Sequence, residues 1–293
     1  MIDPHVHLRD GEERHKETLQ HGLKVAEKLG LSAVFDMPNT RPPVLCREDI
    51  HRRLTIAKAV QSSVYYGLYC GLTSDPGQIA EAVACVRETE QVVGLKLYAG
   101  HSTGDLAVTG RPSQETVFRV LSEHHYRGVL AVHCESETYF QPDLWDPQHP
   151  LTHTLVRPPA AELHAINTIL ELASQSRFNG TLHICHISLP ESVKMIETAR
   201  RDVSFSITCG ATPHHLLLHD MMMEGPEGLL LKMNPPLRSE RDRAGLMDMM
   251  LAGRIDWARD RPCAAPENGK TRSARCLGHP RFSRTTLSDT GPS

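Results

Sequence analysis

The sequence predicts an α/β protein, a (β/α)8 TIM barrel, from three observations. Short apolar segments alternate with segments of helical periodicity through residues 1–257. Apolar strands that alternate with helices pair in parallel through right-handed crossovers. No Gly-rich phosphate-binding motif follows the first strand, which argues against an open, dinucleotide-binding sheet.

The periodic segments follow one another in strand–helix order. Residues 2–7 alternate apolar and polar side chains, as a short buried strand does. Residues 16–30 place leucines at helical spacing and end at Gly30, which suits a helix C-terminus. Residues 31–37 form a second strand, which Pro38 stops. The next strands are expected at residues 63–71, 92–98, 129–133, 181–186 and 203–208, and the helices at residues 49–60, 79–89, 114–125, 160–174 and 192–200. Seven such units favour a closed barrel over a doubly wound sheet.

Composition limits the classes of protein to consider. A chain of 293 residues can form one barrel domain. A net charge of -3 gives no electrostatic case for binding nucleic acid or an acidic membrane. No apolar run approaches the ~18 residues of a membrane span, and no secretory signal begins the sequence. The eight cysteines are scattered singly, which is typical of reduced thiols in a cytoplasmic protein, and the eighteen histidines suggest a metal enzyme.

The first strand carries the motif His5-Val6-His7. On a strand, residues two apart project to the same side, so both imidazoles face one way. If this strand is the first of a barrel, the two rings lie at the rim where barrel enzymes carry out their chemistry. A His-x-His motif alone is equally compatible with two polar residues that cap a strand.

Three later strands deliver similar groups to the same rim. Lys96 lies in the fourth strand, His133 ends the fifth, and His186 ends the sixth. Singly, each has an ordinary explanation, such as a hydrogen-bonded core histidine or a snorkelling lysine. Together they indicate a metal site, and a His-rich site suits zinc. His183 precedes His186 by an odd spacing, which predicts that it points to the opposite face of the strand.

Short motifs in a fixed order along residues 1–257 carry a family resemblance. They are I-D-P-H-V-H-L-R-D at the start, then M-P-N-T, G-L-K-L-Y, H-C-E, C-H-I-S, T-P-H-H-L and N-P-P-L-R. This set resembles the dihydroorotases of the amidohydrolase superfamily, the binuclear zinc type with a carboxylated lysine. The resemblance implies a barrel of the metal-dependent hydrolase type. It also implies interconversion of N-carbamoyl-L-aspartate and L-dihydroorotate in de novo pyrimidine (UMP) biosynthesis.

The resemblance also implies two zinc ions per subunit and assigns their ligands. Lys96 would serve in an N-carboxylated form, because an ammonium repels cations whereas a carbamate offers two anionic oxygens that can bridge them. The ligands of one zinc would be His5, His7 and Lys96, and those of the other would be Lys96, His133 and His186.

Substrate contacts follow from the same resemblance. Arg9 and Asn39 resemble the pair that grips the substrate α-carboxylate, and a guanidinium fits a carboxylate through two hydrogen bonds. Alternatively, Arg9 forms a surface ion pair with Asp10 or Glu12, and Asn39 is a turn residue. The residues that resemble contacts to the pyrimidine ring are Asn234 and His215.

The resemblance ends after Trp257. Relatives continue with T-D-H-A-P-H, whose aspartate binds a zinc and acts as general base and acid, whereas this chain continues with A-R-D-R-P-C-A-A-P. The tail loses its periodicity and shifts to Arg, Pro, Ser and Thr. We therefore expect a barrel domain over residues 1–257 that is incomplete at strand eight, and a non-homologous, disordered tail over residues 258–293, with activity reduced or lost. Asp260 is the weak stand-in for the missing catalytic carboxylate, and Asp256 is less favoured.

Two alternatives stay open. An allantoinase or dihydropyrimidinase-like hydrolase would use the same metal site on a related cyclic amide, but Arg9 and Asn39 indicate a substrate that carries a carboxylate. A catalytically inactive dihydroorotase-like protein, acting as a partner of another pyrimidine enzyme, is the other. The expected ligand is a small molecule, dihydroorotate or carbamoyl aspartate. Neither nucleic acid nor a membrane is expected as a partner, and self-association into a homo-oligomer stays open.

A frameshift near Ala258 would explain the tail. Residues 262–266 can be encoded so that reading from the second base of each codon gives His-Ala-Pro-His. The same shift can turn residues 277–281 into S-G-I-P-G, which resembles the next substrate-loop motif of the family. Codon degeneracy readily produces one such match, but not two in one frame. We predict that sequencing the gene will show both motifs in the shifted frame; their absence there would refute the frameshift.

Overall fold

The strands curl into a barrel wall in which every neighbouring pair runs parallel. The computed structural model describes residues 1–102, 106–225 and 227–258. The strand order is β1-β2-β3-β4-β5-β6-β7-β8, which is the order in the chain. The strands are β1 (Ile2–Val6), β2 (Ala33–Asp36), β3 (Tyr65–Gly71), β4 (Val92–Tyr98), β5 (Val129–His133), β6 (Thr181–Ile184), β7 (Ser206–Ala211) and β8 (Trp257–Ala258).

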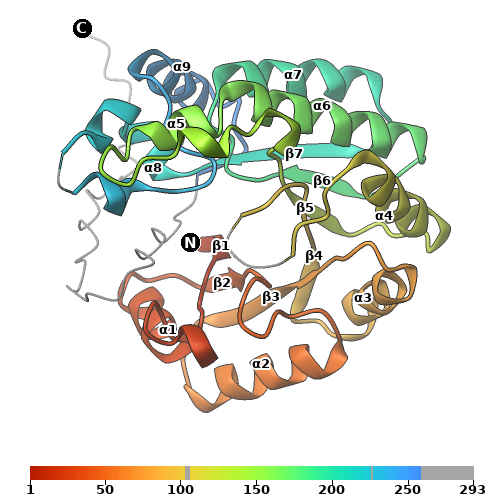
Figure 1. The fold of residues 1–293 in the computed structure, drawn as a ribbon. Helices are drawn as coiled ribbons and strands as arrows, with labels where there is room; N and C mark the ends of the chain where they lie inside the picture. The colour runs from red at the N-terminus through yellow and green to blue at the C-terminus, as the bar shows by residue number, and fades with distance from the viewer. Residues whose placement is uncertain (103–105, 226, 259–293) are drawn as a thin grey trace, which may run out of the picture.

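Helices cover the outside of this wall (Figure 1). The helices between successive strands are α1 (Leu19–Lys28), α2 (Arg47–Ala59), α3 (Pro76–Glu88), α4 (Arg111–Glu123), α6 (Pro159–Gln175) and α7 (Pro190–Asp202). The expected strand–helix alternation is therefore confirmed. None of the described helices is long and apolar enough to cross a membrane.

Several element boundaries differ from those expected, for local reasons. Helices α3, α6 and α7 start earlier, at Pro76, Pro159 and Pro190, because proline suits the first turn of a helix, where its missing N–H is not needed. Strand β7 starts at Ser206 rather than at residue 203, because Val203 is still the C-cap of α7. Sequence periodicity missed the short helices α5 (Thr152–Val156) and α8 (Pro213–Leu217).

A longer helix, α9 (Glu240–Leu251), precedes the last strand and was also not predicted. Its N-cap is Ser239, whose side chain accepts a hydrogen bond from the backbone N–H of Asp242. The helix packs against α7 and α8. A Cβ at Gly245 would lie 2.8 Å from Cγ of Pro190, so the glycine permits this close approach.

The barrel wall is incomplete at its eighth strand, as predicted. Strand β8 has two residues, and it pairs with β7 only at Gly210 and Ala211. Within residues 1–102, 106–225 and 227–258, no strand pairs with the other edge of β1. The predicted tail, apart from Ala258, falls on residues 259–293 and lies outside the described residues.

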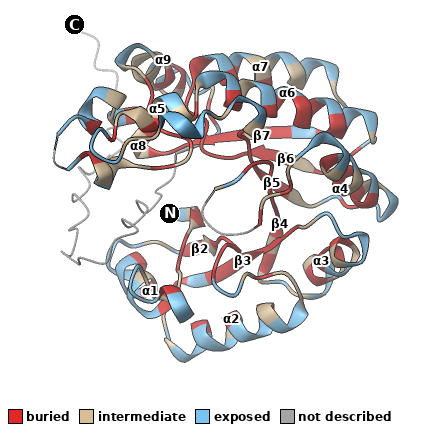
Figure 2. Cartoon of the chain, viewed as in Figure 1, coloured by how far each residue is buried: buried red, intermediate tan, exposed pale blue. Residues whose placement is uncertain are grey.

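The described residues form three buried hydrophobic clusters, two of which are layers of the barrel. The larger layer lies between the strands and the helices, and Figure 2 shows the strands almost wholly buried while the helices expose their outer faces. The smaller layer joins side chains from four different strands or strand ends across the barrel interior. Its buried members are Met37, Tyr69, Ala131 and Cys185. The interior is therefore packed with side chains up to the level of the rim.

Phe178 provides a test of the helix–strand layer. Its ring lies 5.9 Å from that of Phe118 and 5.8 Å from that of Phe205, and it is 1% exposed. Phe178→Ala should lower the free energy of unfolding by about 3–5 kcal/mol, because it leaves a cavity between these rings. Denaturant unfolding measures the change. The matched control, Leu155→Ala at a 54% exposed position, should change stability by no more than about 0.5 kcal/mol, and equal effects would contradict this packing.

Candidate active site

Four imidazoles converge at the carboxyl ends of the strands. Nε2 of His5 and Nε2 of His7 are 3.2 Å apart. The rings of His5 and His186 have centroids 5.5 Å apart, and Nδ1 of His133 lies 3.2 Å from Nε2 of His186. All four side chains are buried. The structure thus brings together the four histidines that the sequence predicted as metal ligands, from β1, the residue after β1, β5 and the loop after β6.

The convergence depends on how each segment leaves its strand. His133 is the last residue of β5, and its partner in β4 is Tyr98. Strand β6 ends at Ile184, and His186 has a φ of 32°, in the left-handed region. This turn, rather than strand geometry, directs His186 toward the other imidazoles.

The prediction for His183 is wrong. Cys185, two residues later, belongs to the interior cluster, so His183 also faces the barrel interior. Its Nδ1 lies 2.9 Å from Oγ1 of Thr208, and its ring centroid is 4.6 Å from that of Trp257. The odd-spacing argument fails because the strand ends before His186. His183 is on the same side as the site but one layer deeper.

Lys96 also belongs to this deeper layer. Its strand partner is Ala131, which belongs to the interior cluster. The side chain is fully buried, with Nζ 3.0 Å from Sγ of Cys185 and 4.9 Å from the ring centroid of Tyr98. That tyrosine ring in turn lies 6.2 Å from the ring of His133. Lys96 is therefore close to the β5 side of the histidine cluster.

The donor set fits zinc. In the described part of the chain, no three His, Cys, Asp or Glu side chains form a ready cation site as they stand. The imidazoles nevertheless form two buried pairs, His5 with His7 and His133 with His186, each with ring nitrogens 3.2 Å apart. Neutral imidazole is a preferred zinc donor, and a buried lysine becomes an anionic ligand if it is carboxylated.

Asn39 and Arg9 lie directly beside His7. Oδ1 of Asn39 is 2.8 Å from Nδ1 of His7, so the amide oxygen accepts from that nitrogen and leaves Nε2 facing His5. Arg9 donates from Nη1 to the backbone carbonyl of Asn39 at 2.5 Å, and it pairs with Glu13 at 3.5 Å. The ion-pair alternative thus involves Glu13 rather than Asp10 or Glu12. The structure thus places Arg9 and Asn39 together, next to the histidine cluster.

A buried ion pair, Arg53 with Asp36, holds the backbone of the segment that carries Arg9. Arg53, on α2, donates to the carbonyl of Leu8 and to the carboxylate of Asp36. Oδ1 of Asp36 accepts from the backbone N–H of Leu8 at 2.9 Å, and the hydroxyl of Tyr66 donates to Oδ2 at 2.8 Å. These bonds hold the chain immediately after His7.

The two predicted ring contacts lie in a neighbouring part of the rim. Oδ1 of Asn234 accepts from Nε2 of His153 at 3.1 Å. His215 is buried, with Nδ1 2.7 Å from Oγ1 of Thr212 and Nε2 3.0 Å from the carbonyl of Pro235. Both ring nitrogens of His215 therefore bind the protein itself and stabilise the loop that carries Asn234.

Of the two predicted stand-ins for the catalytic carboxylate, Asp260 lies outside the described residues, and Asp256 is not at the rim. Asp256 precedes β8, accepts from the backbone N–H of Cys209 at 2.8 Å and pairs with Arg200 of α7. Its carboxylate is thereby engaged on the helix side of the wall, away from the histidines.

Comparison with known proteins identifies the relatives. No protein-family model matches the sequence. A dihydroorotase of Thermococcus kodakarensis is 34% identical over 252 residues, which is 85% of this chain and 52% of the relative. A dihydroorotase of Brevibacillus brevis is 33% identical over 261 residues, 87% of this chain and 58% of the relative. The chain is a homologue of the dihydroorotases. It spans little more than half the length of these curated relatives.

Solved structures confirm the fold of this dihydroorotase homologue. An L-hydantoinase (dihydropyrimidinase) from Arthrobacter aurescens superposes with a TM-score of 0.77 at 23% identity, over 88% of this chain and 56% of that chain. A D-hydantoinase (dihydropyrimidinase) from Thermus sp. gives 0.73 at 22% identity, over 89% and 57%. At these identities the likeness shows the barrel fold alone.

Sequence reasoning assigned no role to a group of buried charges beside the histidines. Glu135, which follows His133 by two residues, is fully buried and pairs with Arg157 at 2.5 Å. Arg238 and Glu162 are also buried, with 3.9 Å between the guanidinium and the carboxylate. Glu135 and Arg238 stand inside the H-C-E and N-P-P-L-R motifs. Their position in those motifs was the signal that could have found them.

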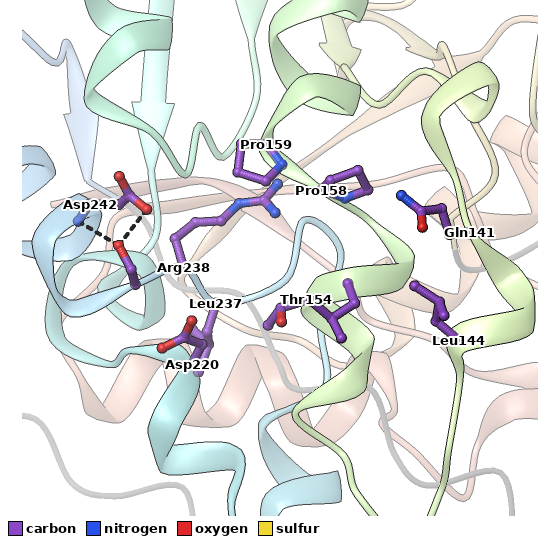
Figure 3. A pocket seen from close by; sticks show the side chains of 11 residues that line it. Gln141, Leu144, Thr154, Pro158, Pro159, Asp220, Leu237, Arg238 and Asp242 are labelled. Atoms are coloured by element: carbon purple, nitrogen blue, oxygen red, sulfur yellow. Dashed lines mark hydrogen bonds between the residues drawn. The ribbon is translucent and has the colours of Figure 1, made fainter.

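Arg238 also lines a cavity of about 280 Å³ (Figure 3). Its walls come from α5, from Pro158 and Pro159, and from the loop that carries Leu237. The figure shows the guanidinium of Arg238 directed toward the two prolines. The predicted metal ligands do not line this cavity, so it is separate from the histidine cluster.

His153 should make stability depend on pH. It is 4% exposed, and burial lowers its pKa from 6.5 to about 4. Because the folded-state pKa lies below the unfolded one, the stabilisation is complete above pH 6.5 and is lost as the pH falls toward 4. The shift corresponds to about 3 kcal/mol.

We predict that lowering the pH from 6.5 to 4 will reduce the free energy of unfolding less in His153→Gln than in the parent chain. Denaturant unfolding at several pH values measures the difference between the two proteins. The control Leu155→Ala, at a 54% exposed position of the same helix, removes no titratable group and should change stability equally at every pH. Parallel profiles for the parent and His153→Gln would contradict the argument.

Proposed function

We propose that this chain is a dihydroorotase, a zinc-dependent cyclic amidohydrolase that interconverts N-carbamoyl-L-aspartate and L-dihydroorotate in pyrimidine synthesis. The supporting observation is the buried cluster of His5, His7, His133 and His186, with Arg9 and Asn39 beside it. The similarity to curated dihydroorotases over 85% of the chain supports the same reaction.

In this proposal, the cluster and Lys96 hold two zinc ions. His5, His7 and Lys96 would bind one, and Lys96, His133 and His186 the other. Lys96 would be N-carboxylated, which suits a lysine that is fully buried among these groups, because a buried ammonium is costly and a carbamate would offer the two cations a negative charge. Bound zinc supplies a water of lowered pKa and polarises the amide carbonyl.

The protein groups around the metal would select and orient the substrate. Arg9 can donate to the substrate carboxylate from nitrogens other than Nη1, which already holds the Asn39 carbonyl. Asn39 fixes the ring of His7 and thereby links the carboxylate site to the metal site. Asn234 and His215 would shape the side of the site that receives the ring.

The proposal places the barrel domain at residues 1–257 and the altered tail at residues 258–293. The tail replaces the T-D-H-A-P-H segment, so the carboxylate that moves the proton in relatives is missing at its usual position. Proton transfer would then be slow. We expect this chain to bind zinc and substrate but to turn over more slowly than a frame-restored version.

A hydantoinase or dihydropyrimidinase activity is the competing proposal, because the solved structures with this fold carry those names. Their substrates differ from dihydroorotate in lacking the ring carboxylate. The position of Arg9 at the rim favours a substrate that carries one. Comparing the turnover of dihydroorotate, dihydrouracil and allantoin distinguishes a dihydroorotase from a dihydropyrimidinase and an allantoinase.

The test couples bound zinc to ring opening. We predict that the 293-residue chain binds zinc, and that Lys96→Ala loses both zinc and hydrolysis. Arg9→Lys should keep zinc but weaken dihydroorotate binding about tenfold or more, because a paired charged hydrogen bond is lost. Its effect on dihydrouracil should be negligible.

Zinc content is measured on purified protein, dihydroorotate affinity by calorimetry, and turnover by loss of ring-amide absorbance. The gene with the frame restored after Trp257 is the positive control for turnover. Faster turnover of dihydrouracil than of dihydroorotate, or equal dihydroorotate affinity in Arg9→Lys, would refute the assignment.

A further inference from the structure

Glu135 contacts the edge of the His133 ring that points away from the other imidazoles. Its Oε2 lies 3.1 Å from Nε2 of His133, whereas Nδ1 of that ring faces His186 at 3.2 Å. A carboxylate accepts hydrogen bonds and therefore favours the tautomer in which Nε2 carries the proton. The lone pair of His133 is then on Nδ1, directed into the cluster.

The carboxylate of Glu135 is also held by a buried arginine. Arg157 donates to Glu135 from Nη1 at 2.5 Å and to the carbonyl of His101 from Nη2 at 2.6 Å. Two fixed contacts thus set the position of the guanidinium and, through it, of the carboxylate.

The same group of charges reaches the loop that carries His186. The carbonyl of Arg157 accepts from Nη1 of Arg238 at 2.6 Å. Nε of Arg238 donates to Oγ of Ser188 at 2.9 Å, and the backbone N–H of Ser188 donates to Glu162 at 3.1 Å. Ser188 follows His186 by two residues. One connected set of bonds therefore supports the histidines of β5 and of the β6 loop.

Stability alone does not explain these charges. A buried ion pair seldom stabilises a fold more than well-packed apolar side chains of similar volume would. Here the pair lies against His133, an imidazole that faces the histidine cluster. Partners that orient a ligating histidine typically alter metal affinity 10–100-fold when removed. The location of the pair therefore indicates a role in metal binding.

We propose that Glu135, clamped by Arg157, is a positioning residue that presents Nδ1 of His133 to the metal and thereby sets the affinity for zinc. This inference rests on the proposed function, in which His133 is a zinc ligand. Glu135 and Arg157 thereby become part of the site, and Nδ1 is the nitrogen of His133 that would bind zinc.

The experiment measures the dissociation constant of zinc by competition with a chromophoric chelator, on the full chain. Glu135→Leu should weaken zinc binding 10–100-fold, and Glu135→Gln, which keeps an acceptor oxygen, should recover much of the loss. Because Glu135→Leu leaves the charge of Arg157 buried, the double variant Glu135→Leu/Arg157→Met removes both charges together. It should fold and still show the weakened binding.

Two further measurements separate positioning from a structural role. The thermal unfolding midpoint of the metal-free double variant should approach that of the parent, while its zinc affinity stays low. Long-range ¹H–¹⁵N spectra of the metal-free parent should show His133 protonated at Nε2, with the signal assigned by its loss in His133→Ala. The control Glu197→Leu breaks the outer pair of Glu197 with Arg254 and should leave zinc affinity unchanged.

The results distinguish a failure of the positioning role of Glu135 from a failure of the zinc site itself. If His133→Ala weakens zinc binding but Glu135→Leu/Arg157→Met binds as the parent does, the positioning role is refuted while the metal site stands. A proton on Nδ1 of His133 also refutes it. If the parent binds no zinc, or His133→Ala binds it normally, the proposed metal site itself is wrong and the inference falls with it.

Discussion

Every strand runs parallel to its neighbours, so all carboxyl ends reach the same rim, and the candidate site depends on this constraint. In a flat sheet, β1 and β6 would be separated by four strands. Curling brings them face to face, and the rings of His5 and His186 come within 5.5 Å. The layers within the wall then order the groups by depth. His133 lies at the level of the rim, whereas Lys96, level with Ala131, lies in the layer below.

Gathering polar groups at one rim carries an electrostatic cost, and buried pairing offsets it. Arg157 meets Glu135, and Arg53 on the opposite side of the rim meets Asp36. Each pair is placed where it also fixes a segment that carries a predicted functional residue. The first lies against His133, and the second holds the backbone immediately after His7. These two buried ion pairs therefore also fix the position of the candidate site residues.

The parts of the site that follow from strand periodicity could be predicted from the sequence. His5 and His7 share a face because they are two apart on one strand, and His133 ends a strand that apolar residues define clearly. His183 was placed on the wrong face because strand periodicity was extended past Ile184, where the backbone turns. The Glu135–Arg157 pair was missed because its members are distant in sequence and pair only in the folded chain.

By itself the sequence determined the alternating elements, the parallel barrel, the break after Trp257 and the residue types that gather at the rim. These are local properties, since apolar spacing and strand-end position are written within a few residues. The tertiary structure decided which nitrogen of each imidazole faces the cluster, and that His183 lies one layer deeper. It also decided which charges hold the rim. Such features depend on contacts between segments that only the closing of the wall brings together, so no local pattern encodes them.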